Sequence, residues 1–278
     1  MGIRPTWSSD GKFLAFTRHR GSGGEDYELV VHALETQEER VYSHPGLSAN
    51  PPGWFRDGMG LLMAVQNTGR TRGLYRVDLK SGQFRQVFEF DPNVFFAGVF
   101  ALSPDEKTLY VPAGDPKNSN IADRIVAVDV ATGEQHQICT VPATGLIKLR
   151  LSPDGRTLAI RREDPQADQA HLARVAVDGS DYRDLYTSNS ARNLMSGLAW
   201  SKDSQAILFL EVDRRDNGQL MRLPLMGGQP EFTGLEVTGV DDIDLDTKGS
   251  RIAFSSATAT DEVWVLDNVL PALKASRQ

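Results

Sequence analysis

The sequence predicts an all-β fold, a six-bladed β-propeller, and three observations carry this prediction. A motif of an apolar anchor residue, a tight turn and an apolar run occurs six times. The six copies follow one another at nearly equal intervals along the 278 residues. After each copy, polar loops and further turns leave room for two more strands. A fixed period of this kind is typical of folds built from repeated units.

The repeated motif begins at residues 5–16, which read PTWSSDGKFLAF. The other copies are PGWFRDGMGLLM, FALSPDEKTLYV, LRLSPDGRTLAI, LAWSKDSQAILF and IDLDTKGSRIAF. Their anchor residues, at successive spacings of 47, 48, 49, 49 and 45, are Trp7, Trp54, Leu102, Leu151, Trp200 and Leu245. Asp-Gly pairs in three copies supply the positive φ angle that tight hairpin turns require.

Each unit is predicted to be a four-stranded antiparallel sheet. The first strand ends at the anchor, and the apolar run, as at residues 13–16, returns antiparallel to it. A polar loop precedes a third strand, as at 27–33, and a second turn precedes a fourth, as at 39–43. One such sheet cannot bury both faces alone, so six of them are expected to stack around an axis. An open solenoid or two sandwiches are the alternatives, and sandwiches give no reason for this period.

We expect a single propeller over residues 1–267 and a C-terminal tail over 268–278. The predicted blades are 3–46, 47–94, 95–143, 144–193, 194–238 and 239–267. The last blade has candidates for three strands only, at 241–245, 251–255 and 262–267, because Pro271 lies in a segment that reads as a short helix or tail. We therefore expect either a natural sequence that continues upstream or a three-stranded blade with an exposed edge.

The motif resembles the repeat of the TolB-like, WD-related six-bladed propellers, W-S-P-D-G-K-x-(I/L)-A-F. Residues 151–160 match it closely, and the resemblance covers residues 3–267. Lys248 departs from the turn Asp, and Glu106 and Ser204 depart from the turn Gly. The resemblance implies the fold. It also implies a role as a binding platform, as a sensor or interaction domain of a regulator or kinase, or as a gating domain of a serine peptidase.

Composition excludes several classes of function. A net charge of −7 argues against nucleic-acid binding by this domain. The chain has no apolar run long enough to insert into a membrane. Cys139 is the single cysteine, so neither an internal disulfide nor a cysteine-rich metal site can form. We expect a periplasmic or other extracytoplasmic location rather than a cytoplasmic one.

No catalytic or cofactor motif is present in the sequence. It contains no G-x-S-x-G elbow, no H-E-x-x-H pair and no phosphate-binding glycine loop. We therefore predict a protein without enzymatic activity, cofactor or metal.

Candidate binding residues are expected at the mouth of the central channel and on the rim made by loops between second and third strands. They are Arg4, His19, Arg20, Arg72, Lys148, Arg150, Arg161, Arg214, Asp242 and Asp244, together with Phe96 in the loop that enters blade 3. Such a mouth would bind a protein, a peptide or a small charged ligand. Four structural alternatives stay open: an ion pair of Arg4 with an aspartate, a cation held by the aspartates of the last blade, local cancellation of the rim charges, and a core-capping role for Phe96.

The predicted function is that of a non-enzymatic binding or interaction propeller, the sensing domain of a larger bacterial regulator. The alternative is the substrate-gating propeller of a prolyl-oligopeptidase-like serine peptidase that lacks its catalytic domain.

Overall fold

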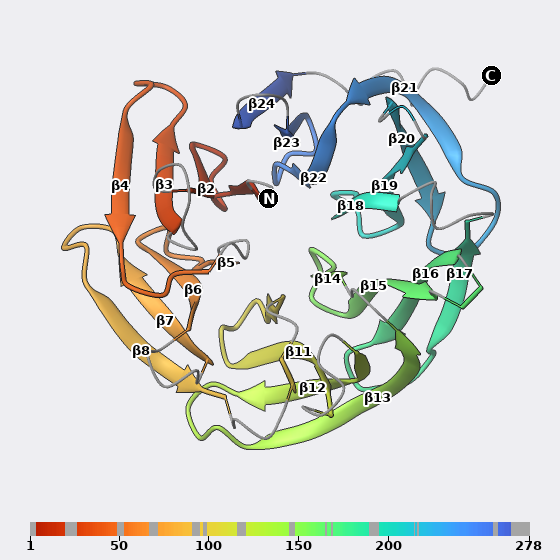
Figure 1. Ribbon diagram of the computed structural model, residues 1–278, viewed down its shortest axis with the longest axis horizontal. Coiled ribbons are helices and arrows are strands. Elements are labelled where there is room, and N and C mark those ends of the chain that lie inside the picture. Colours follow the sequence, from red (N-terminus) through yellow and green to blue (C-terminus); the bar gives the residue numbers. More distant parts are fainter. Residues whose placement is uncertain are drawn as a thin grey trace. The chain divides into compact units, whose positions relative to one another are not determined.

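The protein folds into six antiparallel β-sheets (Figure 1). The computed structural model describes residues 4–19, 27–48, 53–66, 72–90, 95–96, 99–115, 121–144, 148–164, 166–167, 169–188, 195–213, 215, 217–257 and 261–267. Every regular element in these ranges is a strand, and none is a helix. The sheets are the blades of a six-bladed β-propeller, which confirms the predicted fold class.

The first three blades have the following strands. Blade 1 contains β1 (Thr6–Trp7), β2 (Phe13–His19), β3 (Tyr27–Ala33) and β4 (Glu39–Ser43). Blade 2 contains β5 (Gly53–Trp54), β6 (Gly60–Gln66), β7 (Arg72–Asp78) and β8 (Phe84–Glu89). Blade 3 contains β10 (Ala101–Leu102), β11 (Thr108–Gly114), β12 (Ala122–Asp129) and β13 (Gln135–Thr144). It also includes β9 (Phe95–Phe96), which pairs with the far end of β11.

The last three blades follow the same order. Blade 4 contains β14 (Lys148–Leu151), β15 (Thr157–Asp164), β16 (Gln169–Ala176) and β17 (Arg183–Thr187). Blade 5 contains β18 (Met195–Trp200), β19 (Ala206–Val212), β20 (Asn217–Pro224) and β21 (Glu231–Thr238). Blade 6 contains β22 (Val240–Leu245), β23 (Arg251–Ala257) and β24 (Asp261–Asp267).

Two details concern the predicted strand count. In the described part of the chain, blade 6 has three strands in the order β22-β23-β24, as the sequence allowed. Blade 3 has five strands rather than four, because the main chain of β9 pairs with Ala113 and Gly114 of β11. The segment predicted as a loop around Phe96 is therefore a short strand.

The turn after the first strand is held by side chains as well as by glycine. In blade 3 the Ser103 hydroxyl donates to the Asp105 carboxylate and accepts the N–H of Thr108 at 2.9 Å. Glu106 occupies the glycine position with a φ of 63°, in the left-handed region. The bonds of Ser103 and of the Lys107 N–H lower the pKa of Asp105. This network explains how blade 3 tolerates a turn without glycine.

Residue contacts divide the chain into two compact units. Unit 1 comprises Met1–Pro92 and Asp241–Asn268, which hold blades 1 and 2 and nearly all of blade 6. Unit 2 comprises Asn93–Val240 and Val269–Gln278, which hold blades 3 to 5.

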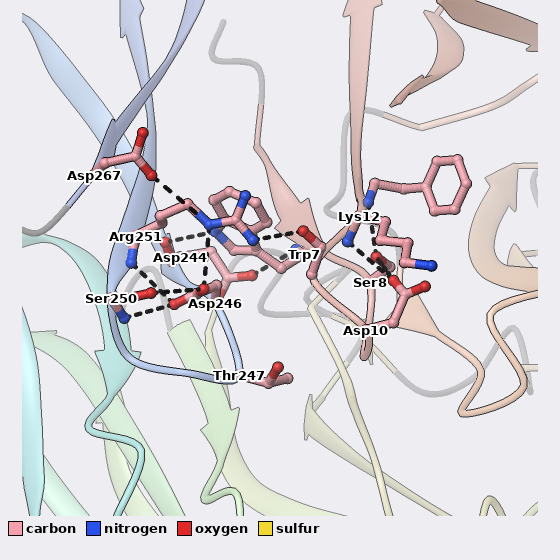
Figure 2. Close-up of polar contacts among 12 residues, drawn as sticks. Trp7, Ser8, Asp10, Lys12, Asp244, Asp246, Thr247, Ser250, Arg251 and Asp267 are labelled. Carbon is pink, nitrogen blue, oxygen red and sulfur yellow. Dashed lines mark hydrogen bonds and ion pairs between the residues drawn. The ribbon is translucent and has the colours of Figure 1, made fainter. Parts of the chain in front are cut away.

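In unit 1 the last blade bonds to the first, as Figure 2 shows. The indole N–H of Trp7 donates to the main-chain oxygen of Asp244 at 3.2 Å, and the Trp7 main-chain N–H donates to the Asp244 carboxylate at 2.9 Å. The Arg251 guanidinium lies 4.6 Å from the centre of the Trp7 ring and donates to the Gly11 carbonyl at 2.6 Å. Blades 6 and 1 are thus joined by polar and cation-π contacts around one buried tryptophan.

The same indole bond recurs at two further blade junctions. Trp54 of blade 2 donates to the carbonyl of Thr6 in blade 1 at 3.1 Å. Within unit 2, Trp200 of blade 5 donates to the carbonyl of Arg150 in blade 4, also at 3.1 Å. In all three cases the acceptor immediately precedes the anchor residue of the neighbouring blade. The tryptophan anchors therefore align the inner strands of adjacent blades.

We expect the indole bond to contribute measurably to stability. Trp200→Phe keeps an aromatic ring but leaves the Arg150 carbonyl without its donor, so the free energy of unfolding should fall by about 1–3 kcal/mol. Trp264→Phe is the matched control, because Trp264 is half exposed, and it should change stability by less than about 0.5 kcal/mol. Equilibrium denaturation of both variants measures the difference. Equal stabilities would contradict a role for the indole N–H.

Candidate functional site

The predicted site residues are distributed over both units. Arg20 and Arg214 lie outside the described residues, and only the main chain of Phe96 is described. In unit 1, Arg4 is half-buried, Arg72 is exposed at the start of β7, and the His19 ring lies 4.3 Å from that of Tyr27. In unit 2, the structure brings Lys148, Arg150 and Arg161 together on blade 4.

At the described rim of blade 1, positive charge is compensated locally. The Arg18 guanidinium pairs with Glu28 at 2.5 Å and with Glu39 at 3.2 Å. The bond to Glu28 raises the pKa of Arg18, so this cation stays paired over the whole physiological range. The expected local cancellation of charge thus occurs here, and this rim offers no strong positive field.

The two aspartates of β22 bond to neighbouring main chain. Asp242 is buried, and one of its carboxylate oxygens accepts the N–H of Ile243 at 3.1 Å. The Asp244 carboxylate accepts the Trp7 N–H at the junction of blades 6 and 1. These contacts give both aspartates a structural role in addition to the binding role that the sequence predicts. The ion pair with Arg4 stays a prediction.

On blade 4, three cationic side chains share one face of the sheet. β14 pairs with β15 so that Lys148 lies opposite Arg161 and Arg150 lies opposite Ala159. Side chains two residues apart on a strand point to the same face. Lys148, Arg150 and Arg161 therefore form one group, which we call the blade 4 cation cluster. The face that it shares with Ala159 packs against blade 5, since Ala159 belongs to the core with Leu198 and Trp200.

Burial makes this cluster unusual. Lys148 is 4% exposed and Arg161 is 2% exposed, although like charges directly opposite on a sheet repel each other. Arg161 pairs with Glu163, whose carboxylate lies 2.5 Å from a terminal guanidinium nitrogen. The Arg161 Nε is buried and has no hydrogen-bond partner. A buried guanidinium with an unused donor is a natural site for an anionic ligand.

The opposite face of blade 4 carries a second buried cation. The Arg162 guanidinium pairs with Asp184 at 2.6 Å and lies opposite His171 in the register of β15 and β16. The His171 Nδ1 contacts the Thr187 hydroxyl at 2.9 Å. Burial and the nearby Arg162 charge lower the pKa of His171. His171 is therefore neutral at pH 7 and becomes charged only in acid.

The sequence reasoning missed an acidic hollow on blade 5. A cavity of about 480 Å³ is lined by Glu211, Asp213 and Glu236, together with Asn217 and Gln219. The Tyr186 hydroxyl donates to Glu211, and burial followed by this bond raises the pKa of Tyr186. Glu211 and Glu236 lie outside the loops that the sequence predicts. Only the register of β19 to β21 shows that the two side chains line the same cavity. In the described residues the rim of blade 5 thus carries three acidic side chains beside the exposed Arg215.

Two further kinds of site are absent from the described residues. These residues contain no cluster of three or more His, Cys, Asp or Glu side chains that could hold a metal ion. They also contain no helix with the length and apolarity needed to cross a membrane.

We expect Glu163 to compensate the blade 4 cation cluster. Glu163→Gln removes the carboxylate beside Arg161, and because Glu163 is partly exposed the free energy of unfolding should fall by about 2 kcal/mol. Glu231→Gln is the control, since the Arg222–Glu231 pair is exposed and 3.7 Å long. That variant should differ from the wild type by less than about 0.5 kcal/mol. Denaturation of both variants at low salt provides the comparison, and an equal effect would refute the assignment.

The lowered pKa of His171 predicts a loss of stability in acid. Because the pKa of His171 is lower in the folded state than its ordinary value of 6.5, the neutral ring makes its full contribution to the free energy of unfolding above pH 6.5. That contribution is lost as the pH falls from 6.5 toward the pKa of the folded state. His171→Gln should remove this part of the slope. NMR titration of the His171 ring gives the pKa directly, and a midpoint at or above 6.5 would contradict the prediction.

Comparison with known proteins gives the same fold at low sequence identity. No protein-family model matches the chain, and no curated protein sequence matches it either. TolB from Acinetobacter baumannii superposes with a TM-score of 0.72 at 17% identity, over 94% of this chain and 62% of that one. The chain thus spans less than two thirds of the length of that TolB.

Two other solved structures extend the comparison. An oligogalacturonate lyase in complex with manganese gives a TM-score of 0.68 at 16% identity, over 96% of this chain and 73% of that one. A prolyl endopeptidase gives 0.59 at 14% identity, over 94% of this chain and 41% of that one. Identities this low establish the fold alone, and the fold is shared by proteins of different activities. The chain therefore has the six-bladed β-propeller fold of the TolB-like proteins, as its sequence motif predicted.

Proposed function

We propose that the protein is a non-enzymatic binding propeller in which the blade 4 cation cluster binds an anionic group of a protein, a peptide or a small ligand. The observation that carries this proposal is the buried Arg161 Nε without a partner, on the same face as Lys148 and Arg150. An anion at this point would complete the hydrogen bonding of Arg161 and offset the repulsion of Lys148.

A role in binding agrees with two further features. The blade 5 hollow lined by Glu211 and Glu236 carries the opposite charge within the same unit. Opposite charges on one unit would orient a partner that carries both signs. A chain from a nidogen/laminin complex has the same fold at 13% identity and a TM-score of 0.63, so this fold occurs in a protein–protein complex. Two points stay predictions from the sequence: that the protein is the sensing domain of a larger regulator, and that its location is extracytoplasmic.

A labelled hexaglutamate peptide tests the binding proposal. Fluorescence anisotropy should show saturable binding that weakens as salt rises, because salt screens the attraction between the acidic peptide and the cationic cluster. Arg161→Gln should weaken binding about tenfold or more, since it removes a charge-assisted donor. Arg183→Gln is the control, because Arg183 is on the same blade, is exposed, and its Nε faces Asp181 at 3.6 Å. Equal loss in both variants, or no binding by the wild type, would overturn the proposal.

Oligogalacturonate tests the non-enzymatic part of the proposal. This acidic oligosaccharide carries the anionic groups that the cluster would bind, and a solved lyase that bears its name shares the fold. We expect binding that Arg161→Gln weakens, without release of shorter oligosaccharides in a chromatographic assay. Cleavage at a rate that rises with protein concentration would show that the protein is an enzyme.

A further inference from the structure

A largely apolar cavity of about 520 Å³ lies between blades 1 and 2, which both belong to unit 1. Its apolar wall is made by Phe13, Val31, Tyr42, Met59 and Leu79. Val31 and Tyr42 are buried, and the partly buried Phe13 and Leu79 pack against the core that contains them. A cavity of this size, with an apolar wall and a few polar groups, has the character of a site for a small ligand.

Main-chain bonds of Leu79 hold the two sides of the cavity in place. Its N–H donates to the Met59 carbonyl at 3.0 Å, which joins the two turns of blade 2. Its carbonyl accepts the Tyr42 hydroxyl at 2.7 Å, which joins blade 2 to β4 of blade 1. The walls are therefore fixed before a ligand binds, which lowers the entropic cost of binding.

The corresponding place at the junction of blades 3 and 4 is packed more closely. There a Cβ atom added to Gly179 would lie 2.3 Å from the Ile138 carbonyl oxygen of β13. Gly82 occupies the same turn of blade 2, and a Cβ atom added to it would have the Tyr42 ring as its nearest neighbour, at 3.7 Å. The outer strand of blade 1 thus stands further from the next blade, and this gap leaves room for the cavity.

Met59 is an apolar side chain at a position that is polar in every other copy of the repeated motif. The residues five places after the other anchors are Lys12, Lys107, Arg156, Gln205 and Ser250. Met59 is 68% exposed and lines the cavity. A flexible thioether side chain at the mouth of an apolar cavity is suited to contact with apolar side chains of a ligand.

Two charged residues of the lining already interact with their own turns. The Asp78 carboxylate accepts the N–H of Lys80 at 3.0 Å and that of Ser81 at 2.7 Å. The charge of Lys12 acts on Asp10, whose pKa it helps to lower. Neither group is therefore fully available to a ligand.

The other charged residues of the lining balance one another. They are Glu35, Glu38, Arg40 and Lys80. All four are exposed, and within the described part of the chain none of them has an ion-pair partner. Two charges of each sign give no net attraction for a purely anionic or a purely cationic ligand. They match a ligand that carries one group of each sign.

The positions of Glu38 and Arg40 indicate how far apart those two groups are. Arg40 lies opposite Val31, and the Glu38 carbonyl accepts the Ala33 N–H at 2.8 Å, so the hairpin continues to Glu38. Residues two apart on a strand share a face, and their Cα atoms are about 6.6 Å apart. A dipeptide has its charged ends on two Cα atoms about 3.8 Å apart, whereas a free amino acid has both on one Cα atom. The spacing therefore favours a dipeptide over a single amino acid.

We propose that the cavity between blades 1 and 2 binds a short peptide of about two apolar residues with free termini. The terminal carboxylate lies against Arg40, the terminal ammonium lies against Glu38, and the apolar side chains contact Phe13, Val31 and Met59. This site uses no residue of the blade 4 cation cluster, which belongs to unit 2. It goes beyond the proposed function, and the two proposals can fail separately.

Isothermal titration calorimetry with the dipeptide Leu-Phe tests the proposal. We expect saturable binding at one site. Acetyl-Leu-Phe lacks the ammonium and Leu-Phe-amide lacks the carboxylate, so each should bind about tenfold more weakly. Free phenylalanine should also bind more weakly, because it lacks both the second apolar side chain and the spacing of the charges. No binding of Leu-Phe, or equal binding of the dipeptide and both derivatives, would overturn the proposal.

Variants of the two charged residues test their assigned roles. Arg40→Gln should weaken Leu-Phe about tenfold and leave Leu-Phe-amide unchanged, because the amide has no carboxylate to lose. Glu38→Gln should weaken Leu-Phe to a similar extent and leave acetyl-Leu-Phe unchanged. Arg85→Gln is the matched control, since Arg85 is exposed on the outer strand of blade 2 and does not line the cavity. An equal loss in that control, or the same loss for a peptide and its derivative, would overturn the assignment.

A variant of Met59 tests the apolar contact. Met59→Gln places the residue of blade 5 at this position and should weaken all three peptides about threefold or more. Met226→Gln is the control, because Met226 is 80% exposed on blade 5 and should not affect binding. Both substitutions are at exposed positions, so thermal melts should match that of the wild type. Equal affinities in the two variants would contradict the site.

Other occupants of the cavity give distinct results. If a second copy filled it, sedimentation would show a dimer that Met59→Gln dissociates. If it held a fatty acid, 11-(dansylamino)undecanoic acid would bind more tightly than Leu-Phe, and Glu38→Gln would strengthen its binding. Either result would overturn the proposal of a peptide. Arg161→Gln should bind Leu-Phe like the wild type, and a loss in that variant would move the dipeptide to the blade 4 cation cluster.

Discussion

The structure depends on one repeated contact, in which an anchor tryptophan donates its indole N–H to a carbonyl on the inner strand of the preceding blade. Trp7, Trp54 and Trp200 make this bond at 3.1 to 3.2 Å. The tryptophan ring excludes water from the junction, so its N–H and the carbonyl are each other's partners in a poorly solvated environment. A blade can therefore rotate against its neighbour only by breaking a polar bond and exposing an aromatic ring. This restraint keeps the inner strands in register and holds the side chains that precede each anchor, such as Arg150 and Asp244, at defined positions.

The candidate surface on blade 4 departs from regular apolar packing. Two cationic side chains lie directly opposite each other in this sheet and are almost completely buried. Lys148 and Arg161 thus bear a desolvation cost that a purely structural core would avoid. This arrangement on blade 4 favours an anionic ligand.

Much of the fold could be predicted from the sequence because the motif is local. The strands expected at 27–33 and 39–43 have those bounds, and the three strands of blade 6 lie where the apolar runs placed them. The strand at Phe96 was missed because its partner, Ala113, lies beyond a long connection and leaves no local signal. Charge alone selected Arg161 and Lys148 for the site. Their burial and mutual opposition depend on hairpin register, which also explains why Glu211 and Glu236 were missed.

The contact between Trp7 and Asp244 also bears on the order in which the chain folds. Its two residues are separated by 237 positions in the sequence, whereas the blades of unit 2 lie within one continuous stretch, Asn93–Val240. A ribosome that releases the chain from the N-terminus would deliver blades 3 to 5 before blade 6 existed. Trp7 would therefore lack its acceptor until the last blade had been synthesised. We infer that the junction of blades 6 and 1 forms late in folding, because it requires the two ends of the chain to meet.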